Sequence, residues 1–372
     1  MQRPARGNVA FTVVVTALVC LGALPVLVLL ALSGAPSSLL LATVLAALPV
    51  GPLVACYLWL DRYEPEPRWL LALGLLWGGF VATAGALLVQ GLGGWVIGFT
   101  EEESLALVAP VTEEFTKGLF LVLLLWWRRN ELDGILDGIV YAGMVGIGFA
   151  FIENILYLAA AYNGSDGMAG GPGALTSVFV VRCLVSPFAH PLFTTFTGIG
   201  VGIAVNSRSR AVRVVAPLAG YAVAVVAHAI WNASTLSGFS GFVGTYLALM
   251  APVFVGMVAL AVWARRSEQR MLVASLTDAA ERGLIPATDI GWLVSLQARR
   301  TSRAHALELG GPPAQAAMRD YQQAAIELGF LHHRYLRGTP PPDFAERGQL
   351  YVQRIAAVRP FVVFPGQVVP SR

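Results

Sequence analysis

A group of carboxylates, imidazoles and one ammonium falls inside apolar stretches that are long enough to cross a membrane. These side chains are Glu113, Glu114, Lys117, Glu153, His190 and His228. A charged group at the centre of a bilayer costs at least about 2.5 to 3.5 kcal/mol on insertion scales, so such residues are functional candidates. Carboxylates and imidazoles can move protons, activate water or hold a divalent metal ion.

The fourth apolar stretch carries two adjacent carboxylates followed by a lysine. At 3.6 residues per turn, Glu113 and Lys117 share a helix face, and Glu114 lies about 100° around the helix. Lys117 can therefore neutralise one carboxylate while the other points elsewhere in a helix bundle. A structural ion pair that holds helices together is the alternative interpretation.

Three later apolar stretches supply the remaining candidates. Glu153 follows small residues that allow helices to approach closely. His190 lies in the sixth stretch, and in the seventh His228 and Asn232 are one helical turn apart on one face. A single buried histidine is commonly a core residue with satisfied hydrogen bonds, so the combination matters more than any one member.

Helix geometry places these candidates at comparable depths. With a rise of about 1.5 Å per residue, Glu113, Glu153, His190 and His228 lie roughly 10 to 21 Å below the outer membrane boundary. We therefore expect one pocket in the outer half of the bilayer. Its carboxylates, its two imidazoles and the carboxamide of Asn232 would hold a divalent metal ion, with zinc as the expected ion, or would polarise water directly.

The composition predicts that most of the chain is embedded in lipid. Of 372 residues, 56% are hydrophobic and 13% charged, and the mean hydropathy is +0.67, whereas about a quarter of the residues in soluble domains are charged. Eight stretches reach the roughly 20 residues that a membrane helix needs. They are Val9 to Ser33, Ser38 to Leu60, Trp69 to Gly91, Ser104 to Trp127, Asp137 to Ala161, Thr176 to Asn206, Ala211 to Ser234 and Val243 to Ala264. We predict an all-α polytopic membrane bundle, with the first stretch retained as a helix because it exceeds the length of a signal-peptide core.

The positions of arginine and lysine orient this bundle. Residues at one set of helix ends, including Arg3 and Arg6, are basic, while the opposite loops 92–103, 162–175 and 235–242 contain no arginine or lysine. Because basic residues stay on the cytoplasmic side, both termini are predicted to be cytoplasmic, with the protein in the cell membrane. The net charge of +3 is small and dispersed, so no nucleic-acid partner is expected.

A second domain is expected after the last apolar stretch. Residues 1–266 form the predicted membrane-embedded domain, and residues 267–372 show amphipathic patterns separated by glycine and proline, typical of a small soluble helical domain. His332 and His333 are adjacent there, but no second cluster accompanies them, so a metal site is not expected. Cys20, Cys56 and Cys183 form no C-x-x-C pair, which gives no indication of a disulfide framework or a thiolate metal site.

The ordered set of motifs resembles the PrsW family of intramembrane proteases, which is related to the CAAX prenyl protease and bacteriocin-processing (Abi) superfamily. The family's E-E-x-x-K corresponds to Glu113, Glu114 and Lys117, and its F-x-x-x-E followed by Asn corresponds to Phe149, Glu153 and Asn154. Its two histidine motifs correspond to His190 and to His228 with Asn232. The resemblance covers roughly residues 50–235, and the additional C-terminal domain is similar to the longer actinobacterial members.

This resemblance implies an intramembrane endopeptidase that is metal-dependent or activated by glutamate, with membrane-anchored anti-sigma factors as the substrate class. Glu113 or Glu114 would be the general base that takes a proton from water. Glu153, His190 and His228 would bind the metal ion or position the water, and Asn232 could hydrogen-bond the oxyanion. The prenyl-protease branch typically has histidine where Glu153 stands, which favours the PrsW branch.

Two other classes of protein can bury the same residue types. A transporter or proton relay also places Glu, His and Lys inside the membrane, but the sequence shows neither a two-fold internal repeat nor a pair of matching broken helices. A non-catalytic membrane scaffold or receptor is the second alternative. The protease interpretation is the one that accounts for the ordered motifs together.

Overall fold

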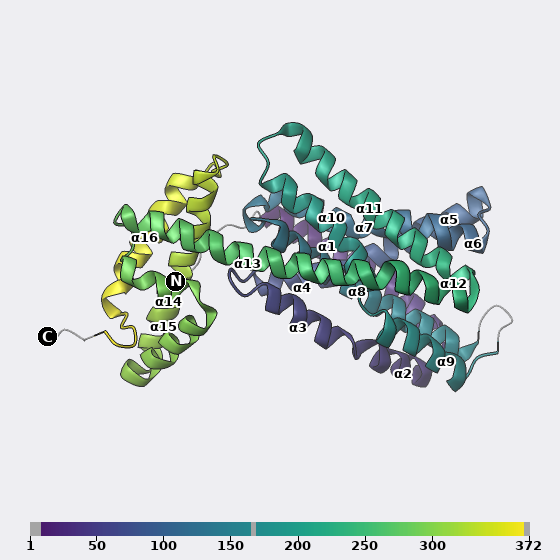
Figure 1. Cartoon of the computed structure of the whole chain (residues 1–372). Coiled ribbons are helices and arrows are strands. Elements are labelled where there is room, and N and C mark those ends of the chain that lie inside the picture. The colour runs from purple at the N-terminus through teal and green to yellow at the C-terminus, as the bar shows by residue number, and fades with distance from the viewer. Residues whose placement is uncertain (1–8, 165–168, 368–372) are drawn as a thin grey trace. The chain divides into compact units, whose positions relative to one another are not determined.

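The computed structural model describes residues 9–164 and 169–367 (Figure 1). The described residues form helices joined by short connections and contain no strand, which confirms the prediction of an all-α protein. Arg3 and Arg6, used to orient the bundle, lie outside the described residues.

The chain folds into two compact units. Unit 1 comprises Met1–Asp61 and Glu66–Ala261, and unit 2 comprises Arg62–Pro65 and Val262–Arg372. The boundary expected near residue 266 falls close to this division, inside one long helix. The protease activity of residues 1–266 and the cytoplasmic location of residues 267–372 stay predictions.

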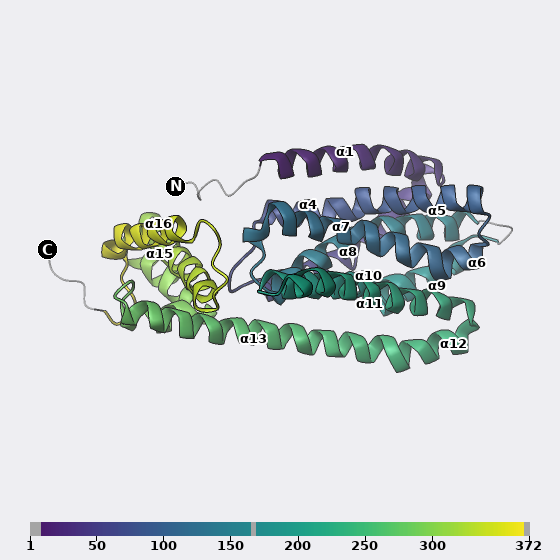
Figure 2. The ribbon, with the colours of Figure 1, turned by 90° about the horizontal axis from the view of Figure 1, so that it is seen from above.

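Most of the helices belong to unit 1, and four of its segments are π-helical (η1, η2, η4 and η5). The elements are α1 (Val9–Leu32), α2 (Pro36–Ala47), α3 (Val50–Leu60), α4 (Arg68–Leu76), η1 (Trp77–Ala82), α5 (Thr83–Ile97), α6 (Glu101–Glu103), η2 (Ser104–Val108), α7 (Ala109–Trp127), η3 (Arg129–Glu131), α8 (Ile135–Asn163), α9 (Pro172–Phe179), η4 (Val180–Val185), α10 (Ala189–Val205), α11 (Arg210–Leu236), α12 (Gly238–Thr245), η5 (Tyr246–Met250) and α13 (Ala251–Glu281), which continues into unit 2. Figure 2 shows α1 lying along α4 and α5 at one edge of the bundle.

Seven helical segments within the described residues are long and apolar enough to cross a membrane. They are Val9–Leu32, Pro36–Leu60, Arg68–Ile97, Ile135–Asn163, Pro172–Val205, Arg210–Leu236 and Gly238–Glu281. The eighth predicted crossing, Ser104 to Trp127, is also helical, but α7 carries Glu113, Glu114 and Lys117 within its 19 residues. The chain is therefore a multi-pass membrane protein. Helix α7 does not count among the apolar spans because it carries the clustered charges.

Helix α8 forms the centre of unit 1. Most of its 29 residues are buried, and it packs against α10, α2, α4 and η1. Glycines allow this close packing, because a Cβ atom at Gly148 would lie 1.9 Å from the carbonyl oxygen of Leu75, and one at Gly78 would lie 1.9 Å from that of Val145. Both contacts are with backbone atoms, which cannot move aside as a flexible side chain would.

We expect Gly148→Ala to destabilise the protein strongly. The added methyl group must separate α8 from α4, and overpacking of this kind costs about 1–3 kcal/mol or more. The midpoint of thermal unfolding in detergent should fall by several degrees. Gly91→Ala is the matched control, because a Cβ atom there meets nothing within 4 Å. Equal unfolding midpoints for the two variants would contradict this packing.

A buried carboxyl group at the end of α3 lies outside the membrane-spanning segments. The side chain of Asp61 accepts a hydrogen bond from the Glu66 amide at 2.9 Å. Burial raises the pKa of Asp61 from 3.8 to about 8; the Glu66 hydrogen bond opposes this rise, and the negative charge of Asp137 adds to it. Because the pKa is higher in the folded than in the unfolded protein, this carboxyl group makes the folded state less stable as the pH rises from about 4 to about 8.

We therefore expect Asp61→Asn to raise the unfolding midpoint at pH 8 and to have progressively less effect as the pH falls towards 4. The asparagine cannot ionise, so it does not lose stability with increasing pH. Thermal unfolding of variant and wild type across this pH range measures the difference. A difference that stayed constant with pH would show that the Asp61 carboxyl group does not titrate as described.

Unit 2 is a helical domain with its own apolar core. Its remaining elements are η6 (Ala287–Asp289), α14 (Ile290–Val294), α15 (Leu296–Leu336), α16 (Phe344–Val358) and η7 (Arg359–Phe361). The fully buried carboxylate of Asp289 accepts hydrogen bonds from Tyr321 and Arg359. His332 pairs with Asp278, so that histidine has a structural role within this unit.

Candidate active site

The structure brings the predicted carboxylates, imidazoles and ammonium together in unit 1. Helix α7 contributes Glu113, Glu114 and Lys117, α8 contributes Glu153, α10 contributes His190 and α11 contributes His228. Glu114 and Lys117 have 0% exposure and His228 has 1%. These groups are thus removed from bulk water and depend on one another for hydrogen bonds.

The Lys117 ammonium lies at the centre of this group. Its Nζ is 2.8 Å from Oε1 of Glu114, 3.4 Å from Oε2 of Glu113 and 3.1 Å from Nδ1 of His190. An ammonium group can only donate hydrogen bonds, so we infer that Nδ1 of His190 is the acceptor and that its proton is on Nε2. Nε2 lies 2.6 Å from Oε2 of Glu153, which accepts that proton's hydrogen bond.

Glu114 fixes the second imidazole. Its Oε1 lies 3.1 Å from Nδ1 of His228, and its Oε2 accepts a hydrogen bond from the Thr194 hydroxyl at 3.0 Å. The His228 ring also stacks on Phe193, with ring centroids 4.8 Å apart. With Nδ1 donating to the carboxylate, Nε2 of His228 is the free ring nitrogen and lies 3.8 Å from Oε2 of Glu113.

Three of these residues present donor atoms that can share one metal ion. Donor atoms of Glu113, His190 and His228 all lie within 4.8 Å of one another. The sequence interpretation gave Glu153 this place. In the structure Glu153 contacts Nε2 of His190 and forms an ion pair with Arg182. The role of Glu153 as a metal ligand stays a prediction.

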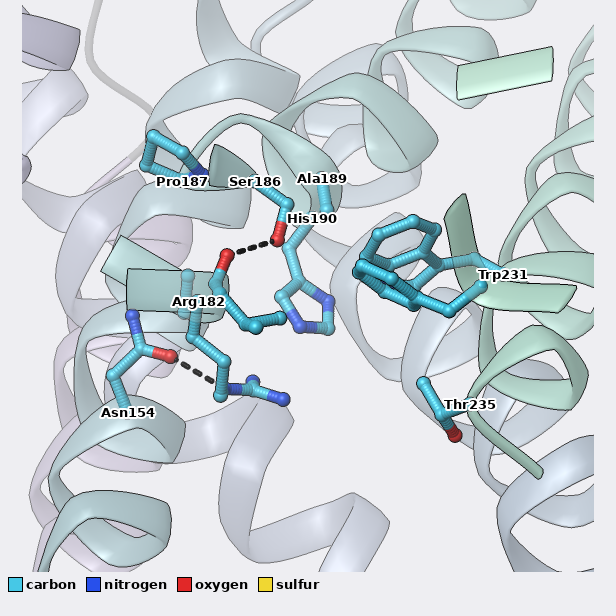
Figure 3. Close-up of a pocket in the computed structure, with 11 residues that line it drawn as sticks. Asn154, Arg182, Ser186, Pro187, Ala189, His190, Trp231 and Thr235 are labelled. Carbon is cyan, nitrogen blue, oxygen red and sulfur yellow. Dashed lines mark hydrogen bonds between the residues drawn. The ribbon is translucent and has the colours of Figure 1, made fainter. Parts of the chain in front are cut away.

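Arg182 is a functional candidate that the sequence analysis missed. Its guanidinium bonds both Glu153 and, at 2.8 Å, Oδ1 of Asn154, and it lies 4.1 Å from the ring centroid of Tyr157. Figure 3 shows Arg182 bonded to Asn154, with His190 beside it. An arginine within the apolar stretch 176–206 was the signal available in the sequence, because intramembrane arginines need partners just as carboxylates do.

Asn232 connects α11 to the segment that precedes α7. Its Nδ2 donates a hydrogen bond to the carbonyl of Leu105 at 2.9 Å. This carbonyl is available because the amide of Ala109 bonds Ser104 in the π-helical turn and the next residue, Pro110, has no N–H. The hydrogen bond holds α11, and with it His228, against the helix that carries Glu113.

A cavity of about 750 Å³ opens onto this group. Its polar lining includes Glu113, Glu153, Arg182, His190 and Asn232, and most of the other lining side chains are apolar. The Arg182 and Glu153 side chains remain 23% and 15% exposed, whereas the Glu114 side chain is fully covered. Such a volume is within the range of ligand-binding pockets, so a substrate could reach Glu113 and Glu153 but not Glu114.

A smaller pocket of about 60 Å³ is also lined by His190 and Arg182 (Figure 3). Asn154, Ser186, Trp231 and Phe242 contribute to its walls. His190, Arg182 and Trp231 line both spaces, so the small pocket adjoins the large cavity.

Comparisons with known proteins match the part of the chain that carries this site. Residues 66–257, more than half of the chain, match the family model described as PrsW family intramembrane metalloprotease. A protein named Protease PrsW from Geobacillus kaustophilus is 31% identical over 142 residues, which are 38% of this chain and 57% of that relative. Another from Oceanobacillus iheyensis, with the same name, is 31% identical over 163 residues, 43% of this chain and 66% of the relative.

Each match therefore covers less than two thirds of the relative's own length. No solved structure matches the chain. The family match includes all of the residues that form the candidate site, from Glu113 on α7 to Asn232 on α11. The resemblance found in the sequence motifs is confirmed, and this chain belongs to the PrsW family of intramembrane metalloproteases.

Proposed function

We propose that this protein is a metal-dependent intramembrane endopeptidase that hydrolyses peptide bonds of membrane-anchored proteins. The observation that carries this proposal is the convergence of Glu113, His190 and His228 inside a membrane helix bundle, where Glu113 and His190 line a cavity. The names of the two relatives, both proteases, support it. No contact among the described residues favours the ion-coupled transporter or the non-catalytic scaffold over this function.

The donor set fits a catalytic metal ion. One carboxylate and two imidazoles are the ligands of many catalytic zinc sites, which supports zinc as the proposed ion. Each imidazole also has a carboxylate at its other ring nitrogen, Glu153 at His190 and Glu114 at His228, the arrangement that orients metal-binding histidines. A bound zinc ion would polarise the scissile carbonyl and make water a better nucleophile.

The three carboxylates have different surroundings, and this favours different roles. Glu114 is engaged by Lys117, His228 and Thr194 and is fully covered, so we assign it the positioning of His228. Glu113 lines the cavity, with Oε2 near Nε2 of His228 and Oε1 near the Gln90 amide at 3.5 Å. One of its oxygens can hold the ion while the other accepts a proton, so we assign Glu113 as the general base.

The substrate and the location follow from the sequence and the family. We propose the cell membrane as the location, with both termini and unit 2 in the cytoplasm, because the basic residues lie at one set of helix ends. The family resemblance supports membrane-anchored anti-sigma-factor-like proteins as substrates. The apolar walls of the cavity are suited to a peptide segment that comes from the bilayer rather than to a soluble polar one.

Metal analysis combined with a cleavage assay tests the proposal. Purified full-length protein in detergent should contain about one zinc per chain, cleave at least one protein of a panel of single-span membrane proteins, lose cleavage on chelation and regain it with zinc. His332→Gln, in the separate unit 2, is the matched control and should cleave normally. Cleavage that is insensitive to chelation, or a metal-free protein that is fully active, would overturn metal dependence.

A further inference from the structure

Arg182 is a cation within a membrane-spanning segment, and its contacts are with residues at or beside the candidate site. It pairs with Glu153, bonds Asn154 and lies against Tyr157. Those three partners are on α8, whereas Arg182 is on the π-helical segment η4. An unpaired carboxylate at this depth would be strongly unfavourable, so the ion pair stabilises Glu153 in its charged form.

The local backbone explains how Arg182 reaches this position. Segment η4 closes with a bond from the Ser186 amide to the carbonyl of Val181, five residues earlier, and the Ser186 hydroxyl donates to the same carbonyl at 2.7 Å. The chain then turns, and α10 begins at Ala189, one residue before His190. Isolated π-helical turns occur frequently at functional sites. Here the turn places Arg182 and His190 in the wall of the same pocket (Figure 3).

A single oxygen atom connects Arg182 to the imidazole. Oε2 of Glu153 accepts from Arg182 and lies 2.6 Å from Nε2 of His190. The second bond from Arg182, to Asn154, fixes the plane of the guanidinium, since the two acceptors are adjacent residues on one helix. Glu153 is thereby held on Nε2, and Nδ1 of His190 is the ring nitrogen that meets Lys117.

We propose that Arg182 is a positioning residue for peptide hydrolysis. It holds Glu153 on Nε2 of His190 and so fixes the orientation of the ring. Lys117 donates to Nδ1 in the metal-free protein, and Nδ1 would bind the proposed metal ion when Lys117 releases it. This inference rests on the proposed function for its catalytic meaning. The effect on the His190 ring is independent of any metal.

Zinc affinity is the first measurement, because a merely structural arginine would leave it unchanged. Loss of a partner behind a metal-binding histidine typically weakens metal binding about 10- to 100-fold. We expect Arg182→Gln to weaken zinc binding by that factor in competition with a chelating indicator, and Arg182→Lys to weaken it less because lysine keeps the charge. Arg128→Gln is the matched control: Arg128 is also a buried arginine, bonded to Thr12, outside the site.

The second measurement is the ¹⁵N spectrum of the histidine rings in metal-free protein, with His190 assigned from His190→Asn. The wild type and Arg182→Lys should show the same Nε2-protonated ring hydrogen-bonded to Glu153. Arg182→Gln should shift the Nε2 signal, because Lys117 still holds the tautomer at Nδ1 but Glu153 is no longer fixed on Nε2. The double variant Arg182→Gln/Glu153→Gln should bind zinc no more weakly than Glu153→Gln alone, because both changes remove one interaction.

Unchanged His190 signals together with wild-type zinc affinity in Arg182→Gln would overturn this inference, even if the wild type cleaves its substrate. A wild type that neither binds zinc nor cleaves would instead overturn the proposed function. In that case the ring spectra still decide whether Arg182 positions His190. If Arg182→Gln does not fold, the double variant Arg182→Lys/Glu153→Gln takes its place. A His190 spectrum and a zinc affinity equal to those of the wild type in this double variant would also contradict the inference.

Discussion

Glu113→Gln is expected to abolish proteolysis while leaving the protein folded. The amide is the same size and can still meet Gln90, but it cannot take a proton from water and is a poor metal ligand. General-base catalysis alone contributes about 10²- to 10⁴-fold, so cleavage should fall at least that far. The rate of cleavage of a model single-span substrate, measured beside the thermal unfolding midpoint, checks both parts of the expectation.

Glu102→Gln provides the control for this experiment, because it makes the same chemical change at an exposed position of unit 1. It should cleave at the wild-type rate. Glu114→Gln should also lose activity, because it removes the negative charge that orients the His228 ring. His228→Ala should lose it because it removes the proposed metal ligand. Full cleavage by Glu113→Gln would remove Glu113 from the chemistry and return the transporter and scaffold interpretations to consideration.

Lys117→Met is expected to cause the largest loss of stability among changes at the site. The fully buried ammonium is the common partner of Glu113 and Glu114, and its removal leaves two carboxylates without a cation between them. Breaking a buried ion pair in this way costs about 3–5 kcal/mol. The unfolding midpoint in detergent should fall by about 10 °C.

The double variant Lys117→Met/Glu114→Gln tests the electrostatic origin of that loss. Removing one carboxylate charge should recover part of the stability, so the two changes should be non-additive. Arg210→Met, which removes an exposed cation from the start of α11, should change the midpoint by less than about 1 °C. Strictly additive effects of Lys117→Met and Glu114→Gln would contradict the direct pairing of these side chains.

The bundle and the meeting of the candidate residues follow from physical regularities that a sequence displays. Apolar length predicts the crossings because lipid excludes unpaired backbone groups, and the period of 3.6 places Glu113 and Lys117 on one face. The cost of burying charge identifies Glu153, His190 and His228 as residues that need partners. In the structure Glu153 pairs with His190, and His228 pairs with Glu114.

The assignment of partners within the site could not be predicted, because it depends on local backbone geometry. The π-helical turns at η2 and η4 displace the helix register, and they decide that Asn232 meets Leu105 and that Arg182 meets Glu153. A regular helical period contains no sign of an inserted residue of this kind. For the same reason the sequence did not separate Glu113, which faces the cavity, from Glu114, which supports His228.

The first coordination shell of bound zinc, measured by X-ray absorption on the purified full-length protein, tests the central claim most directly. Two imidazole nitrogens and at least one carboxylate oxygen around one zinc ion are predicted, with one imidazole lost in His190→Ala and one in His228→Ala. Glu113→Gln should lose the carboxylate contribution, and Glu153→Gln should keep all three protein ligands. A shell without histidine, or one that is unchanged in His190→Ala and His228→Ala, would contradict the assignment of Glu113, His190 and His228 as the metal site.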